Sequence, residues 1–70
     1  MRYYSTQHPL TPGSYPEPVL NQVTAIHNYE DKTYCEEIGR EAWGYIEYEH
    51  PLRPEDAGDF ELTPTPRRIK

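Results

Sequence analysis

Proline positions constrain this chain of 70 residues more than any other feature. Four of its eight prolines stand at positions 9, 12, 16 and 18, and the other four follow residue 50. Proline interrupts the interior of a helix and removes one hydrogen-bond donor from a sheet. Residues 1–22 are therefore predicted to form an extended arm, although the opening RYYST favours β structure. A disordered leader is the alternative for this segment.

The segment AWGYIEYE, residues 42–49, carries the clearest strand pattern. Successive side chains of a strand point to opposite faces of the sheet. One face, which we expect to pack on the core, holds Ala42, Gly44, Ile46 and Tyr48. The other face begins aromatic and ends acidic, and it holds Trp43, Tyr45, Glu47 and Glu49.

Two further segments are expected to complete the sheet. VTAIHNY, residues 23–29, is rich in β-branched and aromatic residues and is predicted to be a strand. The polar EDK that follows indicates a turn. TYCEEI, residues 33–38, suits either a helix face or a hairpin with the strand at 42–49. The hairpin, turning at Gly39-Arg40, is the preferred interpretation.

A short helix is expected after Pro51, which ends the strand. Pro54 suits the first helical turn, and Glu55 and Asp56 interact favourably with the positive end of the helix dipole. The fold class is thus α+β: a small antiparallel sheet of about three strands with one short C-terminal helix. The domain is predicted to span residues 23–62, between the extended proline-rich arm and a flexible basic tail, residues 63–70.

Acidic residues outnumber basic ones twelve to seven, so the formal net charge is −5. Residues 1–66 hold all twelve acids and only four basic residues, a net charge of −8, and the closing RRIK returns three positive charges. An acidic body of this kind repels nucleic-acid phosphates and attracts a basic protein surface. We therefore expect a protein partner with a basic surface and no direct contact with nucleic acid.

Several classes of site are not expected. Cys35 is the only cysteine, which excludes an internal disulfide. The three histidines and Cys35 lack the compact spacing of a metal site, and no glycine-rich phosphate loop is present. Glu47 and Glu49 resemble a catalytic carboxylate pair only superficially. We predict no catalytic residue, no metal and no cofactor. The N-terminus lacks an apolar signal region, and no apolar run approaches membrane-spanning length, which predicts a cytoplasmic protein without membrane contact.

The mixture of aromatic and acidic side chains indicates a binding surface. Tyrosine and tryptophan often anchor protein interfaces, and arrayed carboxylates can attract the Arg and Lys side chains of a nucleic-acid enzyme. The alternative is that the aromatic residues form the core while the acids keep the protein soluble. The candidate partner-binding residues are Trp43, Tyr45, Glu47 and Glu49 on the strand, with Glu36, Glu37 and Glu41 on the adjacent hairpin.

Motifs along most of the chain resemble those of a family of short mobile-element and phage proteins. These motifs are Tyr4-Ser5-Thr6, Pro12-Gly13, Ile38-Gly39-Arg40, Ala42-Trp43-Gly44-Tyr45, Tyr48, Pro51-Leu52 and Phe60-Glu61-Leu62. The chain resembles the defence-against-restriction A C-terminal type and small domains of large polyvalent phage proteins. His8 replaces the arginine usual in the opening motif, and the tail is longer than usual.

The resemblance implies a protein that counters host defence, such as restriction enzymes or CRISPR nucleases, and it supplies no catalytic residue. The leading hypothesis is a non-enzymatic protein-binding module, an anti-restriction or anti-CRISPR inhibitor that acts through an acidic-aromatic face. Two alternatives stay open. One is a self-associating structural module, which would form a homodimer. The other is a protein that sequesters a small molecule or nucleotide.

Overall fold

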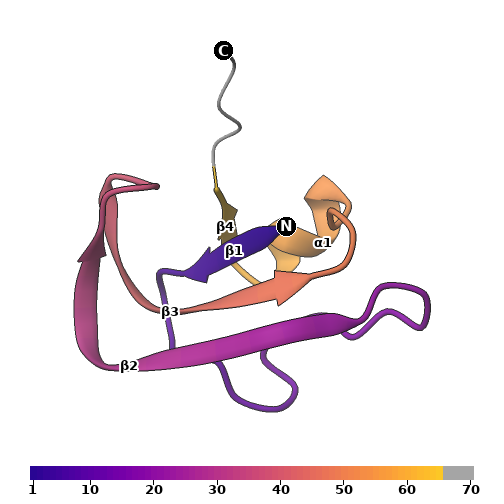
Figure 1. Cartoon of the computed structure of the whole chain (residues 1–70), viewed down its shortest axis with the longest axis horizontal. Helices are drawn as coiled ribbons and strands as arrows, with labels where there is room; N and C mark the ends of the chain where they lie inside the picture. Colours follow the sequence, from indigo (N-terminus) through magenta and orange to yellow (C-terminus); the bar gives the residue numbers. More distant parts are fainter. Residues whose placement is uncertain (66–70) are drawn as a thin grey trace.

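The computed structural model describes residues 1–65 as a four-stranded antiparallel sheet with one short helix beside it (Figure 1). The strands follow one another across the sheet in the order β2-β3-β1-β4. The elements are β1 (Arg2–Ser5), β2 (Val23–Cys35), β3 (Arg40–Tyr48), α1 (Pro54–Asp59) and β4 (Leu62–Pro64). The expected basic tail begins within β4, and its last five residues, 66–70, lie outside the described residues.

The N-terminal arm begins with a strand in the middle of the sheet. β1 lies between β3 and β4 and pairs antiparallel with both. Its Tyr3 stands opposite Ile46, and its Tyr4 stands opposite Tyr45. The expectation of about three strands is therefore corrected to four, and the fold is mostly sheet rather than a balanced α+β arrangement. The RYYST pattern indicated β structure, but its partner strand lies some forty residues away, where local pattern cannot locate it.

β2 continues through the EDK segment, so the turn that the sequence predicts there is wrong. Asn28 pairs with Gly44, and the next pair of the ladder is Thr33 with Ala42. Four residues of β2 therefore stand opposite Trp43 alone, and the strand bends sharply there (Figure 1). A bulge of this kind bends a strand without ending it, which is why polar residues that look like a turn lie inside β2.

The expected hairpin is confirmed, but its turn is residues 36–39, and Arg40 is already paired with Cys35. β2 ends at Cys35, β3 starts at Arg40, and Gly39 between them adopts a φ of +65°, which favours glycine. Gly44 on β3 is required for a different reason. A Cβ atom there would stand 2.3 Å from the carbonyl oxygen of His27, so the two strands approach too closely for any side chain.

The main core lies on the face of β3 that its alternation predicts. Ala42, Gly44, Ile46 and Tyr48 are buried, whereas Glu49 is exposed. Ile46 and Tyr48 belong to the main hydrophobic cluster, whose other buried residues come from the two ends of the chain: Tyr3, Leu10, Leu52, Ala57 and Leu62. Ala42 packs instead in a second, smaller cluster with Tyr4 and Cys35, because the bend in the sheet separates the two ends of β3.

The arm beyond β1 covers this core. The backbone of Leu10 exchanges two hydrogen bonds of 2.8 Å with the side-chain amide of Asn28 on β2. Further along, the hydroxyl of Tyr48 donates a 2.6 Å hydrogen bond to the carbonyl of Pro16. These contacts place residues 10–16 against the sheet, so the arm is part of the fold rather than a disordered leader.

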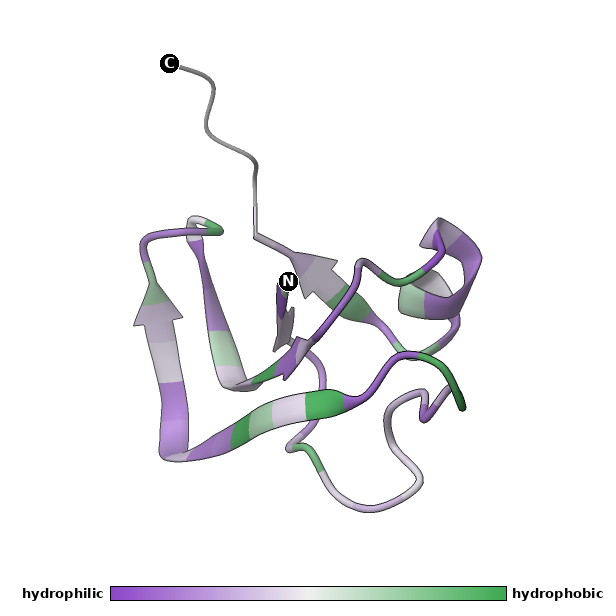
Figure 2. Ribbon diagram, turned by 45° about the vertical axis from the view of Figure 1, so that its right-hand side comes forward, coloured by the Kyte–Doolittle hydropathy of each residue, from purple (hydrophilic) through white to green (hydrophobic). Residues whose placement is uncertain are grey.

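The helix begins at Pro54, with Glu55 and Asp56 in its first turn, as the sequence predicts. It lasts six residues and buries Ala57 against the core. Within residues 1–65, no helix has the length and apolar character that crossing a membrane requires. Hydrophobic segments alternate with hydrophilic ones along the sheet strands, and α1 is largely hydrophilic on its outer side (Figure 2).

Candidate functional site

Aromatic side chains from three strands form a row on the sheet face opposite the main core. His27, Tyr45 and Tyr4 are neighbours across β2, β3 and β1. The His27 ring stacks on Tyr45 with centroids 5.6 Å apart and planes 24° apart, and Tyr4 meets Tyr45 edge-on at 6.1 Å. Tyr29 lies 5.2 Å from His27 and completes the group. We call these four residues the aromatic row.

The guanidinium group of Arg2 lies beside the aromatic row. Its guanidinium carbon lies 4.0 Å from the centre of the Tyr45 ring, a cation–π contact. Its Nε donates a 2.7 Å hydrogen bond to Glu47, and its Nη1 lies 3.7 Å from a carboxylate oxygen of Glu37. Hydrogen bonds from the guanidinium to Tyr4 and Glu47 raise the pKa of Arg2 above its usual value, which keeps this residue charged.

Two residues of β1 contact the side chain of Glu37. Besides its ion pair with Arg2, its carboxylate accepts a hydrogen bond from the hydroxyl of Tyr4. Burial of Tyr4, followed by this bond to a carboxylate, raises the pKa of the Tyr4 hydroxyl, so it stays protonated and keeps donating. The turn between β2 and β3 is thereby tied to β1 at the middle of the sheet.

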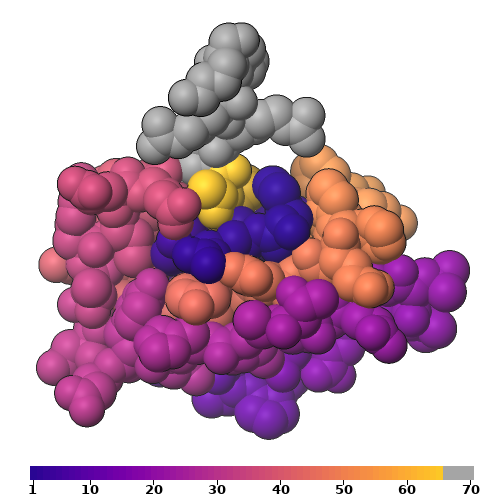
Figure 3. All heavy atoms as spheres, in the orientation of Figure 1, coloured from indigo at the N-terminus to yellow at the C-terminus, as the bar shows by residue number. Residues whose placement is uncertain are grey.

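The far end of the β2–β3 hairpin, residues 30–41, carries further acids, two of which lack such partners. Glu36 and Glu41 are exposed, and neither forms an ion pair with any residue in the described range 1–65. Tyr34 stands opposite Glu41 across the two strands and is 61% exposed. We call residues 30–41 the hairpin end. It forms one side of the molecule, and α1 lies at the opposite side (Figures 1 and 3).

The seven candidate residues thus fall into separate places. Glu47, Tyr45 and Glu37 gather around Arg2, while Glu36 and Glu41 project from the hairpin end. Trp43 is half-buried between the two groups, opposite the bulge of β2. Glu49 stands apart and exposed beyond the end of β3, where its N–H donates to the carbonyl of Gln22.

Sequence reasoning missed Arg2, His27 and Tyr34 as parts of this surface, and it missed Tyr4 as the buried ring beneath it. Alternation in RYYS does put Arg2 and Tyr4 on one face, and it would have indicated both residues if the pairing of β1 with β3 had been known. For Tyr34, the only indication in the sequence was an aromatic residue among the charged residues of the hairpin.

The family model described as "Defence against restriction A C-terminal" matches residues 1–67, which include every strand and the helix. The chain belongs to this family. The match confirms the resemblance drawn from the sequence motifs, and it relates the chain to defence against restriction. Comparison with curated proteins gave no match, and comparison with solved structures gave none either.

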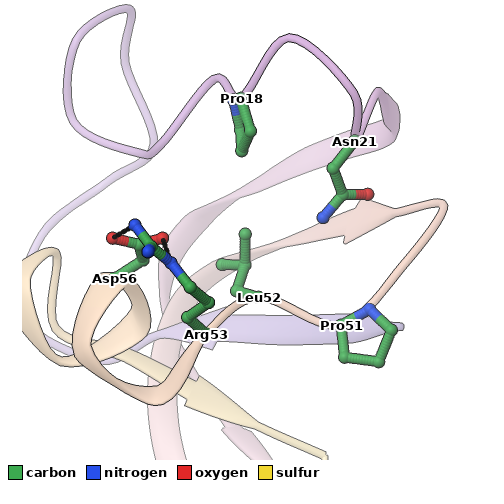
Figure 4. A pocket seen from close by; sticks show the side chains of 6 residues that line it. All are labelled: Pro18, Asn21, Pro51, Leu52, Arg53 and Asp56. Atoms are coloured by element: carbon green, nitrogen blue, oxygen red, sulfur yellow. Dashed lines mark hydrogen bonds and ion pairs between the residues drawn. The ribbon is translucent and has the colours of Figure 1, made fainter.

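This family member also has a shallow pocket of about 270 Å³ between the arm and the start of α1 (Figure 4). Its lining residues are Pro18, Asn21, Pro51, Leu52, Arg53 and Asp56. The Nε of Arg53 lies 3.1 Å from a carboxylate oxygen of Asp56, so the positive charge at the pocket is already paired. The remaining wall is mostly proline and leucine, which offers shape but no reactive group.

Cys35 is buried and lies 3.8 Å from the hydroxyl of Tyr29. Burial and the neighbouring Cys35 raise the pKa of Tyr29 to about 12, so the Tyr29 hydroxyl is neutral near pH 7. Within residues 1–65, no three side chains of the His, Cys, Asp and Glu types are placed to hold a metal ion. The expectations of no metal, no cofactor and no catalysis stay predictions.

Proposed function

We propose that this chain is a non-enzymatic protein-binding module of a phage or another bacterial mobile element. In this proposal it acts in the cytoplasm, where it counters restriction or another host defence by covering a basic surface of a defence protein. The family match supports the biological context. The strong acidic excess of residues 1–66 supports a basic protein partner over nucleic acid.

One observation carries the choice of surface: Arg2 already pairs with Glu47 and Glu37, whereas Glu36 and Glu41 have no such partner among residues 1–65. A cation from another protein would have to displace Arg2 from Tyr45 and Glu47. It meets no such competitor at Glu36 and Glu41. The proposed contact surface is therefore the hairpin end, with Glu36 and Glu41 supplying charge.

An exposed aromatic residue beside these acids supports the same surface. Tyr34 shows more than half of its area to solvent next to Glu41. A tyrosine in that position contributes apolar area and a hydroxyl at little entropic cost, as in known interface hot spots. Single surface charge pairs contribute little. An aromatic anchor surrounded by carboxylates is a stronger arrangement, because the charges steer the encounter while the ring holds the complex.

The remaining candidate residues have a supporting role in this proposal. Glu37 fixes the turn of the hairpin through Tyr4 and Arg2, and Glu47 fixes Arg2 on Tyr45. Trp43 lies where the hairpin end joins the rest of the sheet, so it contributes a half-exposed edge to the contact. Glu49 lies outside the contact and adds only to the overall negative charge.

The test compares two variants that remove the same charge at opposite sides of the molecule. One combines Glu36→Gln with Glu41→Gln, and the matched control combines Glu55→Gln with Asp59→Gln on the exposed side of α1. The tagged proteins are used to capture partners from a bacterial lysate at low and at raised salt. The affinity of each variant for the captured protein is then measured by titration.

The expected partner is a basic nucleic-acid enzyme that the original chain and the α1 control capture equally at low salt and release at raised salt. The hairpin variant should bind it about tenfold more weakly, the effect of two lost charge pairs. Equal affinity of the two variants would reject the hairpin end as the contact. Capture that does not respond to salt would reject a charge-driven partner altogether.

A further inference from the structure

The two edges of the sheet differ in how they are protected. β4 forms one edge with three residues that include Pro64, a short strand that cannot extend a ladder far. β2 forms the other edge with thirteen residues and pairs only with β3 among the described strands. An edge strand of this length leaves a row of backbone N–H and C=O groups without sheet partners.

The direction of these backbone groups follows from the β1–β3 ladder. Met1 and Tyr48 exchange two backbone hydrogen bonds, of 2.8 and 2.9 Å. The N–H and C=O groups of Tyr48 therefore point toward β1. Backbone groups of successive strand residues point to opposite sides within the sheet. Those of Glu47 and Tyr45 consequently point away from β1, toward β2.

The same alternation applies to the first half of β2. Ala25 and His27 stand opposite Glu47 and Tyr45, so their backbone groups are used in the ladder with β3. The N–H and C=O groups of Ile26 and Asn28 then point to the open edge. Asn28 binds the arm with its side chain, which leaves its backbone groups to this edge.

The first half of β2 is also an uncharged stretch of an acidic protein. Residues 22–29 contain no Asp, Glu, Lys, Arg or Pro, the residues that commonly protect an edge strand. Ile26 is 41% exposed there, and Val19 and Leu20 in the preceding turn are 92% and 88% exposed. The start of β2 is the hydrophobic part of this edge, and the strand is hydrophilic around its bend (Figure 2).

We propose that this edge, residues 22–29, binds the same edge of a second copy, so that the two β2 strands pair antiparallel about a twofold axis. Two copies of a chain with net charge −5 repel each other over most of their surfaces. They can approach without opposing carboxylates where both present residues 22–29. A twofold axis brings the same uncharged edge and the same exposed apolar side chains together from both copies.

Two features limit the pairing to this half of the strand. The bulge at residues 29–32 turns the rest of β2 away, and a twofold axis placed there would set Glu30 and Asp31 against the same acids of the other copy. The arm passes behind β2 and forms a turn beyond the edge before it returns (Figure 1).

The test is the mass of the purified chain by light scattering over a range of concentrations, compared between two single-lysine variants. Ile26→Lys places a charge on the proposed interface, and Tyr34→Lys places the same charge on an exposed position in the other half of β2. Circular dichroism checks that both remain folded. Ile26→Pro, which removes an N–H that the β2–β3 ladder does not use, tests the backbone contribution separately.

The original chain and Tyr34→Lys should change from 8.3 kDa to twice that mass as concentration rises. Each substitution occurs twice in a twofold dimer, so Ile26→Lys should raise the dissociation constant about tenfold or more, and Ile26→Pro should act in the same direction. Raised salt should strengthen the dimer, because it screens repulsion between acidic copies. A chain that stays monomeric at every concentration, or an Ile26→Lys variant that dimerises normally, would overturn the proposal.

The same salt series separates this proposal from the function proposed above. Salt should weaken binding of a basic partner at the hairpin end but strengthen self-association at the β2 edge. The Ile26→Lys variant leaves Glu36 and Glu41 intact, so it should still capture the partner. Loss of the dimer with retained capture would therefore confirm two independent surfaces.

Discussion

Arg2 decides which of the acidic residues can serve a partner. It stacks on Tyr45 and pairs with Glu47 and Glu37, so the chain provides its own cation for the most concentrated acidic-aromatic group on its surface. An external arginine gains little from a ring and a carboxylate that are already occupied. This competition within the chain is the physical reason for placing the partner at the hairpin end.

Removing Arg2 should therefore strengthen binding while it weakens the fold. Arg2→Gln frees Glu47, Glu37 and the face of Tyr45, so affinity for the basic partner should rise about threefold to tenfold. The free energy of unfolding should fall by about 1 kcal/mol, because a partly exposed ion pair and a cation–π contact are lost. Titration calorimetry and urea denaturation measure the two effects.

The matched control for this substitution is Arg53→Gln. It removes the same charge from the exposed pair with Asp56, far from the hairpin end. The control should change affinity only slightly. If both variants gained affinity equally, net charge alone would explain the effect and Arg2 would have no special role.

Single elements show where local sequence pattern is sufficient. The alternation in residues 42–49 predicts both faces of β3, since a strand with one buried face must alternate. Pro54 and the acids after it predict the start of α1. Gly39 predicts the turn between β2 and β3. In each case, the residues that specify the structure lie within a few positions of one another.

The elements that were mispredicted depend on distant partners. RYYS becomes a central strand because Tyr3 and Tyr4 meet β3 on one side and β4 on the other. EDK stays within β2 because a bulge accommodates it opposite Trp43. The arm is held by Asn28 and Tyr48, which local pattern assigns only to strands. The position of Arg2, and with it the division of the acidic surface, follows from these same long-range pairings.

At the scale of the whole molecule, a fold built from so many tyrosines should be sensitive to alkali. Burial is the main cause that raises the pKa of Tyr4, Tyr29 and Tyr48, and for Tyr29 it reaches about 12. The unfolded chain releases these phenolic protons near pH 10, about the usual value, whereas the folded chain keeps them. The contribution of these protonated tyrosines to the free energy of unfolding is therefore fully present below about pH 10. It should be lost as the pH rises toward 12.

Ultraviolet absorbance of the phenolate group measures this effect directly. In the folded chain, part of the tyrosine signal should appear late and together with the loss of circular dichroism. In denaturant all seven tyrosines should titrate together near pH 10. Identical titration curves in the two conditions would show that these tyrosines are not held protonated by the fold.

We propose two separate binding surfaces on one small sheet. The hairpin end binds a basic partner, and the β2 edge binds a second copy. The most direct test of the first, which is the central claim, is an amide chemical-shift map. The isotope-labelled chain is titrated with the captured partner, and shifts and line broadening are recorded for each residue. The account predicts the largest changes in the hairpin end, residues 30–41, and in Trp43. Changes centred on α1, or confined to Arg2, Tyr45 and Glu47 with the hairpin end unaffected, would contradict it.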